Sequence, residues 1–383
     1  MDAGYYRMSP LEVAWGFLPG VAGALPAAEG PPLTPRAALE AAVLPALRRE
    51  PCGVAFSGGR DSSLVLAVAV HVARQHGLHE PIPVTRVFPG VADADESDWQ
   101  RLVIEHLGLR QWERIELHDE VDILGPLARR HLLEHGLVWP AALVSAGPLY
   151  ERLQGGTLLD GEGGDEVLGI EAHRLAWIAS LRLHPRPLRW WRIKAALSSL
   201  APAPLRTPLL RRRQADHPRP WLRPPAAAAL DEQIVRDLVE TPLSFAASVR
   251  MAPMRRSQFF GDQSRRAHAH GYGVELESPL LRPEFVHAIA RFGGLTGPGD
   301  RTAVLQRIAG DLLPDAVISR TTKASFNHAY IGRHSIEFAQ RWDGSGVDPE
   351  IVDVEQLRRA WLGTQPPAPT GPLLQQAWLS QQT

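Results

Sequence analysis

A loop suited to phosphate binding is the most specific chemical pattern in the sequence. A hydrophobic stretch, 54–56, runs into two glycines and then into polar residues that can begin a helix. Glycines allow positive φ and a close approach of the backbone to an anion, and the free amides of a new helix point at that anion. The residues with this chemistry are Ser57, Gly58, Gly59, Asp61, Ser62 and Ser63.

Asp61 places a carboxylate in a loop that otherwise favours an anion. A cation between the carboxylate and the phosphates resolves the conflict, and this is how a carboxylate serves a Mg²⁺–nucleotide complex. The loop lacks the Gly-Lys-Ser/Thr ending of the Walker loop. A tight turn with a helix N-cap is the alternative explanation for the same residues.

A second acidic motif follows about one hundred residues later. Asp160, Glu162, Asp165 and Glu166 place four carboxylates within seven residues, separated by Gly161, Gly163 and Gly164. Such a density of negative charge is costly unless a cation or a proton-transfer role compensates it. If both motifs leave the carboxyl ends of parallel strands, Asp61 and Asp165 can hold one Mg²⁺–pyrophosphate from two sides. An unconnected acidic turn is the alternative.

The elements around these motifs alternate between strand and helix. The patterns predict strands at 53–56, 83–88, 112–117 and 157–160, and helices at 34–49, 61–76, 96–107 and 119–135. This rhythm predicts an α/β fold with a parallel, doubly wound sheet.

The chain divides into three expected parts. Residues 1–35 read as an irregular arm, 36–170 as the α/β core, and 171–383 as a mostly helical portion without strands that ends in a peripheral tail from Pro366. Within that portion, 182–223 holds ten arginines and Lys194 against one acid, Asp216. Either it is a solvated insertion, or it is a basic surface that receives an acidic substrate, a peptide leader or phosphates.

Composition narrows the class of protein. The 383 residues have a net charge of −1, so no global field selects nucleic acid or an anionic membrane. No apolar run approaches the ~20 residues of a membrane span. A single cysteine, Cys52, excludes disulfides within the chain, and a cytoplasmic protein is expected. Lys194 and Lys323 are the only two lysines beside many arginines, so each is informative.

The two glycine-rich motifs together resemble a known family. The first resembles the Ser-Gly-Gly-Xaa-Asp-Ser loop of the N-type ATP pyrophosphatases, which have an adenine nucleotide α-hydrolase-like fold. With the second, the chain resembles the synthetase domain of asparagine synthetase B and its relatives, β-lactam synthetase and the lasso-peptide cyclases. Further matches, in order over roughly 36–340, are Phe88-Pro89-Gly90 with Asp95-Glu96, then 272–281, then 320–326.

The resemblance implies a role for individual residues. Asp61 and Asp165 match magnesium-binding aspartates, and Glu162 matches the residue that takes the proton from the attacking amine; β-lactam synthetase has a tyrosine there. Lys323 matches the lysine that neutralises charge on the adenylate and the tetrahedral oxygen. Backbone contacts to the nucleotide are expected from Phe56, Val87 and Gly161.

The implied reaction uses ATP and Mg²⁺ to adenylate a carboxylate, releasing pyrophosphate, and then joins it to an amine. A macrolactam or isopeptide in a peptide natural product is the expected product, from a precursor peptide and with a separate leader-binding or protease protein as partner. Two departures are Glu277, where the family has a basic residue, and the lack of an N-terminal cysteine nucleophile for glutamine hydrolysis. The alternatives are ammonia-dependent asparagine formation, a tRNA-modifying pyrophosphatase, and a silent nucleotide- or peptide-binding adaptor.

Overall fold

The computed structural model describes residues 4–170, 173–181, 196–322, 324, 327–364 and 366–382. In this part of the chain the strands form a five-stranded parallel sheet in the order β3-β2-β1-β4-β5. The strands are β1 Cys52–Ala55, β2 Ile82–Val87, β3 Glu113–Glu116, β4 Thr157–Leu159 and β5 Glu275–Glu277. The predicted α/β class and parallel, doubly wound sheet are confirmed, and each predicted strand is present to within one residue at either end.

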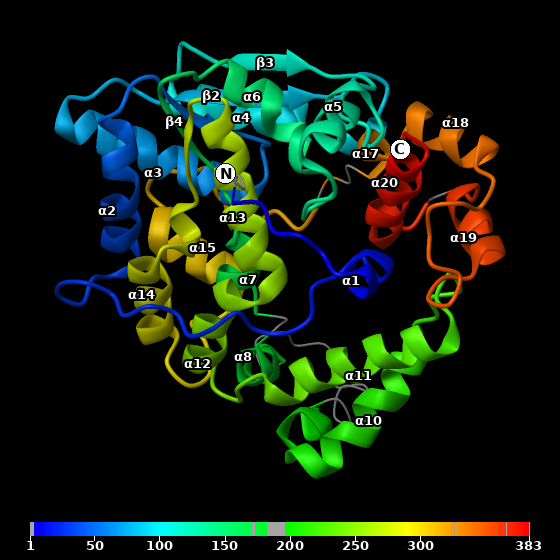
Figure 1. Ribbon diagram of the computed structural model, residues 1–383. Helices are drawn as coiled ribbons and strands as arrows, with labels where there is room; N and C mark the ends of the chain where they lie inside the picture. The colour runs from blue at the N-terminus through cyan, green and yellow to red at the C-terminus, as the bar shows by residue number, and fades with distance from the viewer. Residues whose placement is uncertain are drawn as a thin grey trace.

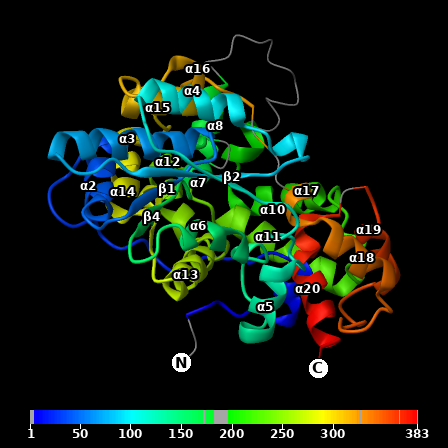
Figure 2. The ribbon, with the colours of Figure 1, turned by 90° about the horizontal axis from the view of Figure 1, so that it is seen from above.

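Helices cover both faces of the sheet (Figure 2). Those up to the end of the acidic motif are α1 Pro10–Trp15, α2 Pro35–Leu47, α3 Arg60–His76, α4 Ser97–Leu107, α5 Pro126–His135, α6 Gly147–Glu151 and α7 Gly164–Leu168. Those after it are α8 Arg174–Ser180, α10 Ala203–Ala215, α11 Pro224–Glu240, α12 Phe245–Met251, α13 Arg256–Gly271, α14 Pro283–Gly293, α15 Arg301–Ala309, α16 Asp315–Ile318, α17 Asn327–Tyr330, α18 Arg333–Arg341, α19 Val354–Trp361 and α20 Gly371–Ser380. Short 3₁₀ turns are η1 Ala92–Ala94, η2 Leu143–Ala146, η3 Ala252–Met254, η4 Pro279–Leu281 and η5 Ala368–Thr370.

Alternation along the strands divides the core between the two faces. Val54 and Leu159 pack with α2, α3, α14 and α15 on one face. Val84 and Leu158 pack with α6 and α13 on the other. Because successive side chains of a strand point to opposite faces, each central strand contributes to both layers. Figure 2 shows α3 and α4 on one side of the sheet and α6 and α13 on the other.

Four sequence expectations differ from the structure. The portion after 171 was expected to have no strand, yet β5 pairs with β4; three residues are too few for a periodic signal. The helix expected over 119–135 begins only at α5, because Pro126 fits the first helical turn and the preceding residues form turns. The expected irregular arm includes α1, which Ser9 and Glu12 cap reciprocally.

The fourth difference concerns the tail, which is not peripheral. Leu373, Leu374 and Trp378 of α20 are buried in a second core with α1, α18 and α19. Figure 1 shows α20 (red) beside α18. This second core closes the part of the molecule that follows the sheet in sequence. No helix among the described residues is long and apolar enough to cross a bilayer.

Asp122 joins the loop before α5 to the start of α18. Its side chain is fully buried and accepts hydrogen bonds from the amides of Leu124 (2.8 Å), Gly332 (2.9 Å) and Ser335 (3.1 Å), and from the Ser335 hydroxyl. We expect Asp122→Ala to lower the free energy of unfolding by about 2–4 kcal/mol, since buried donors lose their acceptor. Chemical denaturation measures this change.

Asp98→Ala is the matched control for Asp122→Ala. Asp98 is 95% exposed and only 3.5 Å from Arg101, so its removal should change stability by less than about 1 kcal/mol. Equal losses in the two variants would show that the Asp122 contacts do not stabilise the fold.

Candidate active site

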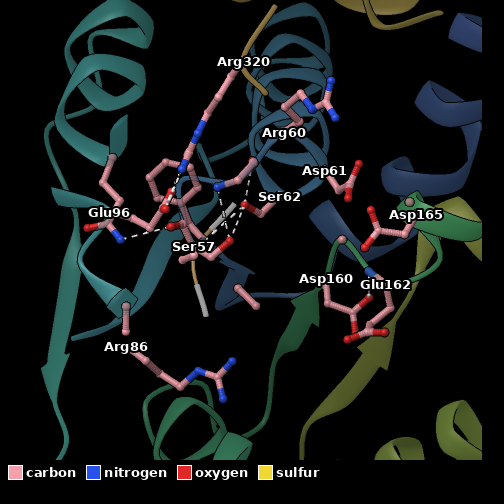
Figure 3. A pocket seen from close by; sticks show the side chains of 18 of the residues that line it. Ser57, Arg60, Asp61, Ser62, Arg86, Glu96, Asp160, Glu162, Asp165 and Arg320 are labelled. Carbon is pink, nitrogen blue, oxygen red and sulfur yellow. Dashed lines mark hydrogen bonds and ion pairs between the residues drawn. The ribbon is translucent and has the colours of Figure 1, made fainter. Parts of the chain in front are cut away.

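The two predicted motifs lie at the carboxyl ends of neighbouring strands. β1 and β4 pair directly, and the connection after β1 turns one way along the sheet while β4 lies on its other side. Such a switch point is where ligands of open α/β sheets bind. A cavity of about 440 Å³ opens there, and both loops line it. Figure 3 shows this cavity and its polar side chains.

Hydrogen bonds within the first loop hold it open toward the cavity. The Ser62 hydroxyl lies 3.1 Å from that of Ser57 and accepts from the Ser57 amide at 3.2 Å, and the Gly59 amide donates to the Ser57 hydroxyl at 3.3 Å. Gly58 has φ +83°, and a side chain there would meet Gln100 of α4. Gly59, the N-cap of α3, makes no side-chain cap. The first amides of α3 therefore face a site suited to an anion.

Glycines let the acidic loop pack against the start of α3. A Cβ on Gly161 would lie 2.8 Å from the Ser62 amide, and one on Gly164 would overlap the Asp61 carboxyl group. Only glycine fits at these two positions, so the close approach of the two motifs depends on them. The packing brings Asp61 and Asp165 to face each other across the cavity (Figure 3).

Arg301, the first residue of α15, bridges the two aspartates. Its guanidinium pairs with Asp61 and lies 2.6 Å from Asp165. Burial raises the pKa of Asp61, and Arg301 opposes that rise. Within the described residues, no group of three His, Cys, Asp or Glu side chains is arranged to hold a metal ion. Two carboxylates are nevertheless a normal protein contribution to a Mg²⁺ site that phosphates complete, and a cation already lies between them. The residues present therefore fit the expected Mg²⁺.

Glu162 and Asp160 form a second charged group beside the first. The Glu162 carboxylate, half exposed to the cavity, lies 3.0 Å from Arg265 of α13, and the Glu162 amide donates to Asp160 at 3.1 Å. Burial raises the pKa of Asp160 to about 7, the Arg265 charge opposes this, and the Glu162 charge adds to it. Glu162 is thus an oriented carboxylate at the cavity wall.

A buried ion pair closes the cavity on the side of α4. Glu96, just before α4, pairs with Arg320, which also donates to the Gly58 carbonyl at 3.1 Å and lies 4.6 Å over the Trp99 ring. Arg320 is 6% exposed. It therefore ties the segment after α16 to the phosphate loop, and the cavity-lining residues Thr322 and Ala324 follow it.

The cavity brings together most, but not all, of the predicted site residues. Those that line it are Phe56, Ser57, Gly59, Asp61, Ser62, Gly161, Glu162 and Asp165. Gly58 and Ser63 do not line it: Gly58 packs on α4, and Ser63 is fully buried with its hydroxyl unpartnered. Lys323 lies outside the described residues, as do 182–195 of the arginine-rich stretch.

Val87 also lies off this cavity, and its neighbour Arg86 lines it instead. Strand alternation explains the difference, because adjacent residues face opposite sides. The Val87 carbonyl accepts the Leu117 amide at 2.8 Å, and the Phe56 carbonyl accepts the Thr85 hydroxyl at 2.7 Å. The expected backbone contacts to the nucleotide stay predictions.

Sequence reasoning missed the arginines of the site. Arg265 and Arg301 belong to no motif, and only an unpaired excess of acid in the two loops signalled that cations must come from elsewhere. Glu277, expected to remove a basic contact, lies 2.7 Å from Arg282 and 3.6 Å from Arg266, and it does not line the cavity.

Comparison with known families gives one match. The family model described as asparagine synthase matches residues 35–368. No curated protein matches the chain. The match includes both glycine-rich loops, Arg265, Arg301 and Arg320.

Gly164→Ala tests the contact between the two motifs. We expect the added methyl to displace the Asp61 side chain, lowering the free energy of unfolding by about 1–3 kcal/mol and ATP–pyrophosphate exchange by at least about tenfold. Gly271→Ala, at a helical position with no atom within 4 Å of the added Cβ, is the control and should be neutral. Normal exchange in Gly164→Ala would contradict the packing argument.

The raised pKa of Asp160 predicts a pH dependence of stability. The folded carboxyl binds its proton more tightly than the unfolded chain, whose Asp pKa is near 4, so this group destabilises the fold progressively as pH rises from about 4 to about 7. Relative to Asp160→Asn, the wild type should lose about 2–4 kcal/mol between pH 4 and 8. Urea denaturation at several pH values measures the difference, and parallel pH profiles would refute it.

Proposed function

The chain belongs to the asparagine synthase family of AMP-forming, ATP-dependent ligases, and we propose that it couples an adenylated carboxylate to an organic amine, forming a macrolactam or isopeptide bond in a peptide natural product. The observation that carries this proposal is the position of Glu162 in the same cavity as the phosphate loop. One cavity then serves both activation of the carboxylate and attack by the amine.

The nucleotide half of the reaction belongs to the first loop and the two aspartates. The amides at the start of α3 and the hydroxyls of Ser57 and Ser62 bind the phosphates of ATP. Asp61 and Asp165 hold Mg²⁺, which when bound neutralises charge on the departing pyrophosphate. The substrate carboxylate attacks the α-phosphate, forming an acyl-adenylate and releasing pyrophosphate. Lys323 neutralises the charge that grows on the phosphate, as the resemblance implies.

The amine half belongs to Glu162. An ammonium is not a nucleophile, so the amine must lose a proton to a base within hydrogen-bond reach. Arg265 orients the Glu162 carboxylate at 3.0 Å and keeps it from the two aspartates. The neutral amine then attacks the acyl carbon, and AMP leaves with the electrons of the broken acyl–phosphate bond.

Cys52 favours an amine other than one derived from glutamine. It is the one cysteine of the sequence, it is buried, and burial raises its pKa to about 12. A thiol in that state is no nucleophile for amide hydrolysis, so these residues have no thiol route from glutamine to ammonia.

The surface of α10 supports a peptide substrate. Leu205 and Leu209, four residues apart, are 63% and 51% exposed, and Arg212 and Arg213 continue along the exposed side. An apolar patch with a basic flank suits an acidic, partly apolar peptide segment. Arg206, on the inner side of α10, instead donates to the carbonyl of Leu238 and faces α11.

Two variants separate the halves of the reaction. Glu162→Gln should still exchange labelled pyrophosphate into ATP with the carboxylate substrate, yet form amide about 10²–10⁴-fold more slowly. Asp61→Asn should lose exchange itself, because it removes a charge from the metal site, and Lys323→Ala should lower exchange and amide together. Exchange assays and product mass spectrometry measure both steps.

The outcomes of this experiment decide between assignments. If Glu162→Gln abolishes exchange as fully as Asp61→Asn, Glu162 belongs to the metal site and the base lies elsewhere. If the wild type shows no exchange with any carboxylate, peptide or amino acid, the chain is a binding protein instead of a ligase. Amide formation from aspartate and free ammonia would favour asparagine synthesis over macrolactam formation.

A further inference from the structure

Arg301 occupies a position that neither motif accounts for. It begins α15 after a segment in which Gly294, Gly297 and Gly299 have positive φ, and Asp300 caps the helix by accepting the Ala303 amide at 2.8 Å. Its side chain is 15% exposed, against 21% for Asp61 and 48% for Asp165. The guanidinium therefore enters the site from the helical portion and lies between the carboxylates that the metal needs.

The charges explain why a cation is required there. The nearby negative charge of Asp165 raises the pKa of Asp61, and the positive charge of Arg301 opposes it. An arginine at neutral pH cannot give up its proton. It can vacate the carboxylates only by moving to another anion.

Free Mg²⁺ supplies no such anion. It would bind Asp61 and Asp165 but leave a largely buried guanidinium without its partners, and an uncompensated buried charge typically costs about 3–5 kcal/mol. The Arg301 Nε atom is already buried without a hydrogen-bond partner, so the side chain has little to fall back on. A polyphosphate bound with the metal brings anionic oxygens that accept the displaced guanidinium.

We propose that Arg301 is an internal counter-ion that closes the metal site of the nucleotide-free protein, so that Asp61 and Asp165 take up Mg²⁺ only together with a polyphosphate. This proposal rests on the proposed function for the identity of the ligand, a metal–polyphosphate complex. It makes metal and polyphosphate binding mutually dependent, and by linkage each strengthens the other by the same factor. Arg301 is a positioning residue for the two aspartates.

Equilibrium dialysis of the full chain with Mn²⁺, a substitute for Mg²⁺, tests this without any turnover. The wild type should retain Mn²⁺ weakly when alone and at least about tenfold more tightly with inorganic pyrophosphate. Arg301→Ala should bind Mn²⁺ alone at least about tenfold more tightly than the wild type, and pyrophosphate should then add less. Arg307→Ala is the control, because Arg307 is an exposed residue of the same helix and its removal changes net charge equally.

Each outcome decides the proposal. Equal Mn²⁺ affinity in the wild type and Arg301→Ala, or an equal gain in Arg307→Ala, would overturn it. If Arg301→Ala does not fold, Arg301→Gln keeps a hydrogen-bond donor without the charge and should show the same gain in Mn²⁺ binding; no gain there also overturns it. The dialysis result is independent of ATP–pyrophosphate exchange, so failure of the ligase assignment and failure of the counter-ion role are distinguishable.

Discussion

The compensation of negative charge at the carboxyl ends of β1 and β4 is the constraint on which the rest of the site depends. Asp61, Asp160, Glu162 and Asp165 all line one cavity, and such a cluster is costly without cations. The helical portion supplies them: Arg265 from α13 meets Glu162, and Arg301 from α15 meets both metal-binding aspartates. The α/β part thus contributes the acids and the helical part the arginines, so neither part makes the site alone.

This division of charge also separates the chemistry within one cavity. The Arg301 group lies beside the phosphate loop, where charge leaves with pyrophosphate, and the Arg265 group lies beside the carboxylate that receives a proton. Fixed counter-ions of this kind are worth more in a partly buried site than in water, because they need no reorganisation during reaction. The two arginines therefore keep a metal-binding pair and a proton acceptor apart, although all four carboxylates are close in space.

Close packing of backbone holds this arrangement in register. Gly161 and Gly164 let the acidic loop touch the start of α3, and the pairing of β1 with β4 fixes their relative height. On the far side, Glu96 and Arg320 join α4 to the segment that precedes Lys323. The second core around α20 gathers α1, α18 and α19 beyond that segment. A change far along the chain can thus reach the cavity through packed elements.

The sequence by itself determined the α/β class, the strands β1 to β4 and the pairing of Asp61 with Asp165, because these follow from local periodicity and from glycines that have one structural use. It did not determine β5 or the burial of α20, since three residues show no period and an apolar tail does not name its partner. It also could not choose between Arg86 and Val87, because a shift of one residue reverses the face of a strand. The arginine partners of the acids were decided only by tertiary structure: Arg301 lies 240 residues from Asp61, and a contact over that separation is set by how the helices pack, of which no local pattern keeps a record.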